Sequence, residues 1–516
     1  MTDSWTGPGV VVRHGRLWGS AADPARVALR FVDGPSLTHA QLWSAVADRE
    51  DEFAAARLHR GDVLCLLQEN TPDLVLDLLA SFRLGIVVVP LNTALRGASL
   101  EAVLHDVGPC LLRCGPALVE VGLAAADAVE GAGLWPVGAA APRVRSGPRD
   151  RPIDGRAESD VAAIMLTSGT TGLPKGVVWP HAMALAFAEH TTWVMGYRED
   201  DVIYTCLPLF HINGLFCALY AGLLTGAEVV IARRFSAATY WRDIAATGAT
   251  VTNMMGSIPA ILWRGEPGAH ERKHRLRLGM VLPLPADRAA FEERFGFPTT
   301  EVYGSTDTGL PLGIPFGSSR PGSCGRPTPG WECDVVDEDD HPVGDGVEGE
   351  LVVRPRRPHI GFAGYWRHPE ATVAATRNLW LHTGDVVTRD ADGWFTYRGR
   401  RKEMIRVSGE NVAPLQVEAA LLRHPDVLEV AAYAVPSDLG EESVAVAVVP
   451  RAGADVHPAD LRALAERDLP YFAVPRFVLL TDELPKTATA KVVKADLEAL
   501  GVTAEHWDGG RPRRQQ

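Results

Sequence analysis

Short apolar runs alternate with stretches of helical spacing along the first 140 residues. Two of these runs, VLCLLQ at 63–68 and IVVVP at 86–90, have the length and composition of buried strands. Between them, DLVLDLLASFRLG at 73–85 repeats its apolar residues at three- and four-residue intervals, which predicts a helix. Strands separated by helices indicate a sheet with parallel pairs of strands and helices on its faces.

The same alternation resumes after residues 142–160, which are rich in Pro, Arg and Gly and are typical of a connecting loop. VAAIML at 161–166 predicts a buried strand, and a helix is expected over roughly 181–195. Further apolar runs follow at 202–209, 214–224 and 228–234. From 320 to 400 the pattern changes to short strands separated by Gly, Pro and Asp turns, which indicates a small β-rich subdomain.

After Arg400 the pattern changes once more. VEAALLRHP, VLEVAAYAVP, SVAVAVVP and HPADLRALAERDL predict a compact α+β module. We therefore predict an α/β protein with two domains. Residues 1–399 form a large N-terminal domain of mixed sheets flanked by helices, plus the small β-rich subdomain, and residues 400–516 form a small C-terminal domain.

Composition narrows the classes of function. The chain has 516 residues, of which 46% are hydrophobic and 22% charged, as in ordinary globular proteins. Its 64 acidic and 51 basic residues give a formal charge of −13, which argues against nucleic-acid and anionic-membrane partners. The seven cysteines are scattered, no signal peptide is evident, and no apolar run reaches the length of a membrane span. We expect a cytoplasmic protein with reduced, buried thiols.

The segment MLTSGTTGLPKG at 165–176 combines many hydroxyl groups and glycines with a single lysine. Hydroxyls and unhindered backbone amides in one loop are suited to binding phosphate. The spacing differs from the P-loop, because Lys175 follows Pro174 and precedes Gly176 rather than a Ser or Thr. The loop follows a predicted strand, where backbone amides can point into a crevice.

Four further segments occur with this loop in a characteristic order: YGSTDTG at 303–309, WLHTGD at 380–385, GRRKEMIRVSGENV at 399–412 and LPKTATAK at 484–491. Together they resemble the adenylate-forming superfamily of acyl-CoA synthetases, adenylation domains and luciferases. Within it, the chain is similar to the acyl-CoA ligase branch that includes crotonobetaine/carnitine-CoA ligase-like enzymes. The resemblance covers residues from about 25 to 500.

The resemblance implies attack of an acid on the α-phosphate of ATP, giving an acyl-adenylate and pyrophosphate, with Mg²⁺ present and CoA as the acceptor. Tyr303 resembles the adenine-stacking aromatic and Thr306 the α-phosphate contact, while Asp385 and Arg400 resemble the ribose and phosphate contacts. The full nucleotide-binding set implied in this way is Thr167, Ser168, Gly169, Thr170, Thr171, Gly172, Lys175, Tyr303, Gly304, Asp385 and Arg400.

Lys491 resembles the catalytic lysine that a mobile C-terminal domain brings to the carboxylate and the α-phosphate. Asp307 stands where the family has a glutamate that contacts Mg²⁺, and a shorter carboxylate still offers a hard oxygen ligand. Lys402 matches the hinge position of the domain rotation. Ser408 and Gly409 would line the thiol channel in the second half-reaction.

The chain departs from the family where the acid is expected to bind. Residues 279–285 read GMVLPLP and place Val281 and Leu282 where glycine and alanine are common. Branched side chains there would reduce the volume for a long chain, so we expect a small or flat acid. His211 is a candidate for catalysis by direct substrate contact, or else for ordinary packing. The pocket candidates are His211, Asn213, Gly214, Val281, Leu282 and Gly309.

Three functions stay open on the sequence. The leading one is an ATP-dependent acid–CoA ligase. The second is an adenylating enzyme that loads the phosphopantetheine of a carrier protein. The third is an enzyme that adenylates nitrite for transfer to an aryl amine, since a constricted pocket suits a small oxyanion. Homodimers are common in the family, although no feature of the sequence requires one.

Overall fold

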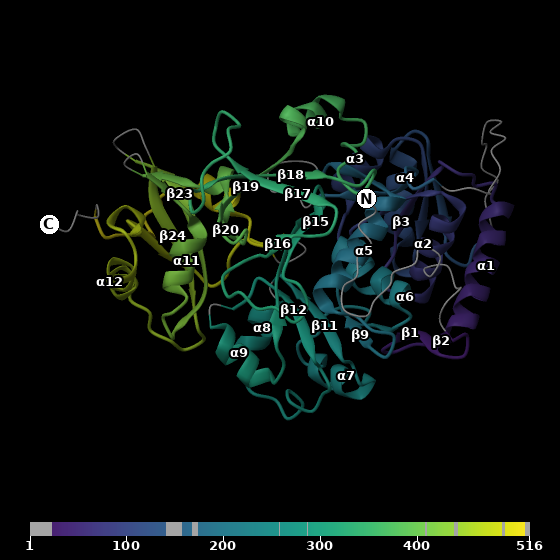
Figure 1. Cartoon of the computed structure of the whole chain (residues 1–516), viewed down its shortest axis with the longest axis horizontal. Helices are drawn as coiled ribbons and strands as arrows, with labels where there is room; N and C mark the ends of the chain where they lie inside the picture. The colour runs from purple at the N-terminus through teal and green to yellow at the C-terminus, as the bar shows by residue number, and fades with distance from the viewer. Residues whose placement is uncertain are drawn as a thin grey trace.

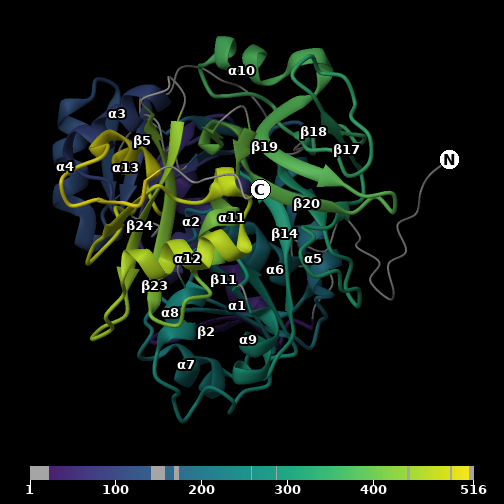
Figure 2. The same ribbon diagram turned by 90° about the vertical axis from the view of Figure 1, so that its left-hand side faces the viewer.

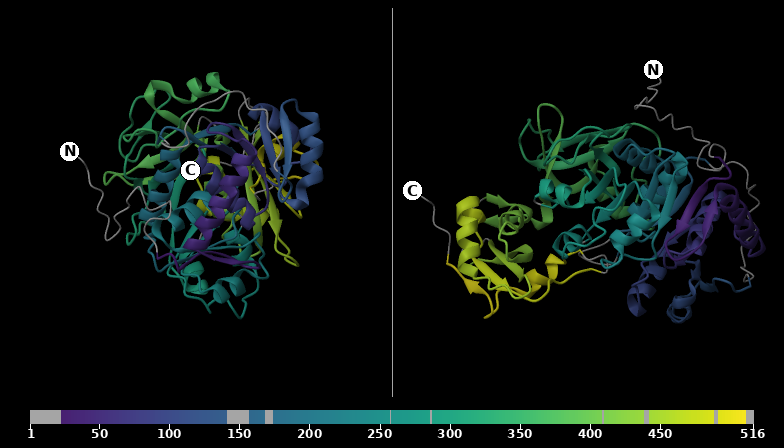
Figure 3. Two further views of the ribbon diagram at one scale, coloured as in Figure 1. Left: turned by 90° about the vertical axis from the view of Figure 1, so that its right-hand side faces the viewer. Right: turned by 90° about the horizontal axis from the view of Figure 1, so that it is seen from below.

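The computed structural model describes residues 23–140, 157–167, 174–256, 258–285, 287–407, 410–437, 442–487 and 491–510, with the backbone alone at 402, 410 and 411. The large domain is built in layers, with the C-terminal domain at one end of the molecule (Figures 1 and 2). Seen from below, the C-terminal domain forms a separate lobe at the far end from α1 (Figure 3).

The first sheet has the strand order β6-β5-β3-β4-β7-β8 and is parallel except for the β7–β8 pair. Apolar residues of α3 and α4 cover its outer face, in a cluster with Cys65, Val89 and Ile164. The bounds are β3 Val63–Leu67, β4 Val87–Pro90, β5 Cys110–Cys114, β6 Ala132–Pro136, β7 Val161–Leu166, β8 Gly176–Pro180, α3 Gly97–Val107 and α4 Val119–Ala128.

The second sheet has the order β13-β12-β11-β9-β10-β1-β2, with only β1 and β2 antiparallel among its described pairs. Its outer face packs against α7, α8 and α9. The bounds are β1 Val27–Phe31, β2 Ser36–Thr38, β9 Val202–Thr205, β10 Glu228–Ile231, β11 Val251–Met255, β12 Leu278–Leu282, β13 Thr299–Thr300, α7 Tyr240–Thr247, α8 Ile258–Arg264 and α9 Arg288–Phe295.

Helices packed between the two sheets form the largest core, to which both inner sheet faces contribute. They are α1 His39–Ala55, α2 Pro72–Leu84, α5 His181–Met195, a π-helical segment Asn213–Tyr220 and α6 Ala221–Thr225. Helix α2 shows how local sequence sets these boundaries. The Thr71 side chain accepts a hydrogen bond from the Leu74 amide, Pro72 begins the helix, and Gly85 ends it at φ 70°.

The β-rich subdomain contains the sheets β14-β15-β16 and β17-β18-β19-β20, which share a core with α5. All its described strand pairs are antiparallel, as the Gly- and Pro-rich turns predict. The bounds are β14 Val302–Ser305, β15 Gly309–Gly313, β16 Arg326–Pro327, β17 Trp331–Val336, β18 Gly349–Pro355, β19 Leu381–Arg389, β20 Phe395–Arg400 and α10 Pro369–Ala375.

The C-terminal domain has the sheet β23-β24-β25-β26 and the ribbon β21-β22. Apolar clusters lie on both faces of the sheet, one with α11 and α12 and the other with α13. The bounds are β21 Ile405–Val407, β22 Glu410–Val412, β23 Val427–Pro436, β24 Glu442–Pro450, β25 Phe477–Leu480, β26 Trp507–Asp508, α11 Pro414–Leu421, α12 Pro458–Asp468 and α13 Lys494–Leu500.

The predicted α/β class, with a large domain of mixed sheets and a small α+β domain, is confirmed. Local details differ from simple alternation. The apolar run at 202–209 contains a strand only as far as Thr205, and the run at 214–224 is helical. All seven cysteines lie in the described part of the chain and are free thiols. Among the described residues, no helix combines the length and the apolarity needed to cross a membrane.

Candidate active site

The hydroxyl-rich loop connects the antiparallel strands β7 and β8, and its two ends are tied together. The Thr167 amide donates to the Lys175 carbonyl oxygen at 2.9 Å, and the Lys175 amide donates to Thr167 Oγ1 at 3.1 Å. The Lys175 Nζ lies 4.9 Å from the centre of the Tyr365 ring. Ser168, Gly169, Thr170, Thr171 and Gly172 lie outside the described residues, so their phosphate contacts stay a prediction.

A tight hairpin between β14 and β15 carries the next motif. Gly304 is required there by packing, because a Cβ atom would lie 2.3 Å from the carbonyl oxygen of Gly309. Gly309 itself has φ 68°, a conformation that favours glycine. Thr306 lies in the turn, where its carbonyl oxygen accepts a hydrogen bond from Trp179 Nε1 at 2.8 Å. The turn thereby holds the backbone of Thr306 and the neighbouring Asp307 in place.

One oxygen of Asp307 has no hydrogen-bond partner among the described residues. Its Oδ1 is enclosed by protein and makes no hydrogen bond within the described part of the chain. Burial raises the pKa of the Asp307 carboxyl, while a hydrogen bond from Tyr365 and the charges of Arg400 and Lys175 oppose the rise. An enclosed carboxylate oxygen with no donor is costly unless a ligand occupies it. The structure thus brings Lys175, Asp307 and Arg400, from three separate motifs, to one place.

Asp385 on β19 is 3% exposed and ties this place to the next motif. The Tyr303 hydroxyl donates to Asp385 Oδ2 at 2.5 Å, and Arg400 Nε donates to Oδ1 at 3.1 Å. Burial raises the pKa of the Asp385 carboxyl, and the charge of Arg400 is the largest opposing effect. A carboxylate accepts about four hydrogen bonds, so roughly two acceptor positions remain for hydroxyl donors of a ligand.

Lys491 of the C-terminal domain faces the same cluster of charges. Burial by surrounding protein and the charge of Arg400 lower the pKa of the Lys491 amine, and the charges of Glu403 and Asp385 raise it. The residue as a whole is still exposed to solvent. Two neighbouring lysines are engaged elsewhere. Lys486 Nζ lies 2.7 Å from Glu429, and Lys494 Nζ lies 2.7 Å from Glu418. Of these three lysines, Lys491 is the one whose pKa responds to the charges of Arg400 and Asp385.

The hinge candidate lies where the large domain ends. Lys402 occupies a turn of 3₁₀-helix, Arg401–Glu403, directly after β20, and its side chain is not described. Ser408 and Gly409 connect β21 to β22 and lie outside the described residues. The roles of these three residues stay predictions.

His211 and Asn213 come together at the start of the π-helical segment. His211 Nε2 is enclosed without a hydrogen-bond partner in the described part of the chain, and burial lowers the pKa of His211 to about 4. The ring is therefore neutral near pH 7. Asn213 Oδ1 accepts a hydrogen bond from Asn253 at 3.1 Å, and Asn213 Nδ2 lies 3.8 Å from the sulfur of Met280. This segment lies beside β12, the strand that carries Leu282.

Two of the pocket candidates have a packing role. Val281 is fully buried in the core between the second sheet and α7–α9, whereas Met280 and Leu282 face the other side of β12. Side chains alternate along a strand, so Val281 points away from the face that Leu282 shares with His211's segment. Val281 therefore belongs to this core, and its expected effect on the acid pocket stays a prediction. At Gly214 a Cβ atom would lie 2.6 Å from the Pro208 carbonyl oxygen, so close packing requires glycine there.

Tyr365 is the site residue that the sequence did not indicate. It hydrogen-bonds Asp307 and its ring lies against Lys175, although it is far from both of these residues along the chain. It precedes Trp366, whose amide donates to the Gly176 carbonyl oxygen at 2.7 Å, and this bond holds the segment against β8. The only signal in the sequence is the aromatic pair after a glycine, GYW at 364–366, and paired aromatics of this kind are common in ordinary apolar cores.

The sequence of the whole chain is similar to that of known enzymes. Residues 18–366 match the AMP-binding enzyme family, and residues 416–491 match the AMP-binding enzyme C-terminal domain. The chain is 34% identical to the sulfoacetate–CoA ligase of Cupriavidus necator over 90% of this chain and 92% of that protein. It is 32% identical to the oxalate–CoA ligase of Arabidopsis thaliana, over 91% and 94%.

Relatives of the predicted branch are also found. A crotonobetaine/carnitine–CoA ligase of Escherichia coli is 27% identical over 86% of this chain and 90% of that protein. The crystal structure of ATP-bound MatB from Rhodopseudomonas palustris superposes with a TM-score of 0.83 at 27% identity, covering 94% of this chain and 97% of that one. The chain belongs to the AMP-binding enzyme family, in agreement with the resemblance of its motifs to adenylate-forming enzymes.

Proposed function

We propose that this enzyme is an ATP-dependent acid–CoA ligase that acts on a small acid. The observation that carries the proposal is the enclosed Oδ1 of Asp307, which has no hydrogen-bond partner among the described residues and is near the charges of Lys175 and Arg400. A buried anionic oxygen flanked by cations suits a bound metal–polyphosphate group better than a neutral ligand. The relatives described above are CoA ligases, so they lend no support to the carrier-protein and nitrite alternatives.

The first half-reaction activates the acid. A carboxylate oxygen attacks the α-phosphorus of ATP, the bond from that phosphorus to the β-phosphate bridging oxygen breaks, and pyrophosphate leaves. Lys491 would place its positive charge against the carboxylate and the α-phosphate as charge shifts in the transition state. Thr306 would hold the α-phosphate, and Lys175 with the hydroxyls of 167–171 would bind the β- and γ-phosphates. Tyr303, Asp385 and Arg400 would hold the nucleoside.

Asp307 would hold Mg²⁺ together with the phosphates of ATP. Among the described residues, no group of three or more His, Cys, Asp or Glu side chains could hold a metal by itself. That finding fits an ion bound by one carboxylate, substrate phosphates and water, the usual arrangement for Mg²⁺ at a nucleotide. The ion supplies positive charge at the phosphates when bound, and Asp307 supplies an oxygen in a fixed position.

The second half-reaction transfers the acyl group to CoA. The thiol gives up its proton, its sulfur attacks the acyl carbon, and AMP leaves to yield a thioester. Rotation of the C-terminal domain about Lys402, at the proposed boundary between residues 399 and 400, would withdraw Lys491. It would bring Ser408 and Gly409 to the channel for the pantetheine arm. The charges of Arg400 and Asp385 both act on the pKa of Lys491, which supports a domain orientation suited to adenylation.

The substrate is proposed to be a small acid. Two relatives are named for sulfoacetate and oxalate, both of which are short. Leu282 and Met280 lie on one face of β12, and Asn213 Nδ2 lies 3.8 Å from the sulfur of Met280. The neutral His211 ring, whose Nε2 has no hydrogen-bond partner within the described residues, could donate to or accept from a polar group of the acid.

The test is pyrophosphate release from Mg-ATP with a panel of acids, each with and without CoA, followed by detection of the thioester. The panel contains sulfoacetate, oxalate, short aliphatic, dicarboxylic and aryl acids, acids of twelve carbons or more, and nitrite. Thioester formation with a short acid supports the proposal. Turnover that needs a carrier protein or nitrite, or a maximum on long chains, contradicts it. Asp307→Asn serves as the inactive control and Asp390→Asn, in an exposed turn, as the active one.

A further inference from the structure

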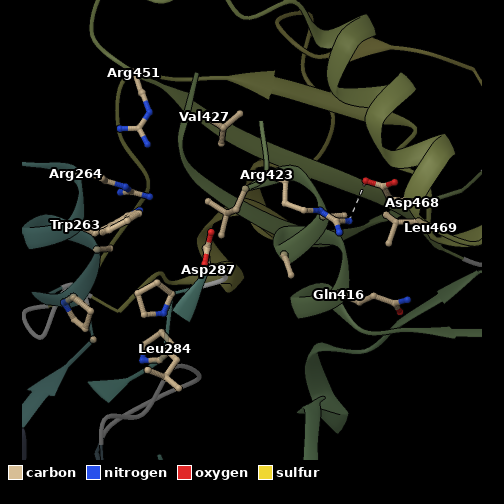
Figure 4. A pocket seen from close by; sticks show the side chains of 18 residues that line it. Trp263, Arg264, Leu284, Asp287, Gln416, Arg423, Val427, Arg451, Asp468 and Leu469 are labelled. Carbon is tan, nitrogen blue, oxygen red and sulfur yellow. Dashed lines mark ion pairs between the residues drawn. The ribbon is translucent and has the colours of Figure 1, made fainter. Parts of the chain in front are cut away.

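A cavity of about 900 Å³ lies between the two domains, apart from the nucleotide motifs. The large domain contributes α8, residues 283–285 and Asp287, and the C-terminal domain contributes α11, the start of β23 and the segments around 451 and 468 (Figure 4). Its charged lining residues are Arg264, Asp287, Arg423, Arg451 and Asp468.

Two of these arginines face each other across the domain interface. Arg264 ends α8 in the large domain, and Arg451 follows β24 in the C-terminal domain; their guanidinium groups lie on the same side of the cavity (Figure 4). Burial lowers the pKa of Arg264; Glu429 opposes this shift, whereas the charge of Arg451 adds to it. Arg451 Nε donates to the Pro425 carbonyl oxygen at 2.6 Å, which fixes the position of its guanidinium group.

The cavity is lined by three arginines, Arg264, Arg423 and Arg451, and by two carboxylates, Asp287 and Asp468. Asp468 lies 3.0 Å from Arg423, whereas Asp287 keeps its charge and accepts the capping hydrogen bond of α9 from the Ala290 amide. Glu429 is the carboxylate closest to Arg264, at 3.5 Å, but it also lies 2.7 Å from Lys486 Nζ. The Glu429 carboxylate therefore has two positively charged neighbours, Arg264 and Lys486. Because Arg451 adds another positive charge near Arg264, positive side chains outnumber carboxylates around this pair.

We propose that the arginine pair binds the phosphate group of a small molecule in this cavity, and that the bound anion links the two domains. A phosphate between two guanidinium groups accepts charge-assisted hydrogen bonds from both and removes their mutual repulsion. The cavity has the volume of ordinary small-molecule sites, which are about 300–1,000 Å³. The source of the phosphate can be inorganic phosphate or a phosphate ester, and the two are distinguished by titration.

The site has a consequence for catalysis that rests on the proposed function. Arg264 and Arg451 are brought together in the present domain orientation, which we take as the adenylation orientation because the charges of Arg400 and Asp385 act on Lys491. A ligand that binds only this orientation stabilises it, since a ligand shifts an equilibrium by its differential affinity for the two states. The anion therefore favours adenylation and slows the transfer to CoA, which requires the other orientation.

The test is calorimetric titration of the full chain with inorganic phosphate and with glycerol 3-phosphate, in the absence of ATP, acid and CoA. Each guanidinium–phosphate contact is a hydrogen bond between charged groups, so Arg264→Gln and Arg451→Gln should each raise the Kd by about tenfold or more. Arg423→Gln is the matched control, because Arg423 lines the same cavity but is paired with Asp468, and its Kd should stay within about twofold. Tighter binding of the ester than of inorganic phosphate identifies an ester as the ligand.

Three results overturn the proposal: no binding to the wild-type protein, equal losses in all three variants, or binding that is lost in Lys175→Ala and kept in both arginine variants. The last result would put the phosphate at the nucleotide motifs. In a second assay, the phosphate ligand should slow thioester formation in the wild-type enzyme and leave Arg451→Gln unaffected. If no acid gives a thioester, the proposed ligase function fails while the calorimetric result stands.

Discussion

Tyr303→Phe removes a single oxygen atom from the centre of the site. The Tyr303 hydroxyl donates to Asp385 Oδ2 at 2.5 Å, and Tyr303 and Asp385 are 8% and 3% exposed. Phenylalanine keeps the ring and its packing against β19, but it leaves the buried carboxylate with Arg400 as its remaining charged partner. Water cannot easily replace the lost donor at so enclosed an oxygen.

The magnitude follows from the charge on the acceptor. A hydrogen bond to an ionised group contributes roughly 1.5–3 kcal/mol, more than a bond between neutral groups. The Asp385 carboxyl already has a raised pKa because of burial, so its charged form depends on the donors that remain. We expect Tyr303→Phe to lower the free energy of unfolding by about 1.5–3 kcal/mol at pH 7.5.

The assay is urea denaturation of the wild-type and variant proteins, with Tyr397→Phe as the matched control. Tyr397 lies 6.2 Å from Tyr303 between ring centres and is also largely enclosed, but its hydroxyl makes no hydrogen bond to a side chain of the described residues. Its loss should change stability by less than about 1 kcal/mol. In parallel, the KM for ATP should rise at least about fivefold in Tyr303→Ala, which loses base stacking, and much less in Tyr303→Phe.

Two results would refute this reasoning. Tyr303→Phe could prove as stable as the wild type, in which case Asp385 is protonated or solvated rather than held by the hydroxyl. Alternatively, Tyr397→Phe could lose as much stability as Tyr303→Phe, and the loss would then reflect ring packing rather than the hydrogen bond. Equal increases in the KM for ATP in Tyr303→Phe and Tyr303→Ala would show that the ring does not stack on adenine.

Four further predictions follow from the described geometry. Asp307→Asn should reduce pyrophosphate release about a hundredfold or more, whereas Asp307→Glu, the side chain common in the family, should keep Mg²⁺-dependent release. Lys491→Ala should also reduce pyrophosphate release about a hundredfold. The pKa of Lys491 is lowered from 10.5, so the charged amine is present at low pH and is lost as the pH rises through that lowered pKa. The activity of the wild-type enzyme should fall in that pH range, and the activity of Lys491→Arg should fall only at higher pH. Burial lowers the pKa of His190 to about 4, so folding disfavours protonation of this ring. The free energy of unfolding should therefore fall by about 3 kcal/mol as the pH drops from 6.5 to 4. In His190→Gln the free energy of unfolding should change less with pH over that range. Gly304→Ala should lower the melting temperature, since its Cβ would lie 2.3 Å from the Gly309 carbonyl oxygen, at a cost of about 1–3 kcal/mol, and an unchanged melting temperature would contradict the packing argument.

The sequence by itself determined the class of fold and several element boundaries, because these depend on local signals. The strand at 63–67, the helix at 72–84 and the helix at 181–195 follow from apolar spacing and from caps such as Thr71 and Gly85. The family was also determined by sequence, because its motifs have a fixed order along the chain. The run at 202–209 shows the limit, since its strand ends at Thr205 although the apolar residues continue.

Only the tertiary structure decided on which face of a strand a side chain lies and which residues distant in sequence come into contact. The pleat of β12 turns Val281 into the core with α7–α9, and a one-residue difference in register cannot be read from an apolar run. Tyr365 joins Asp307 and Lys175 only because its segment is bound to β8. The arginine pair at 264 and 451 likewise arises from the packing of two domains. Such contacts join residues far apart along the chain, and the local spacing of residue types cannot predict them.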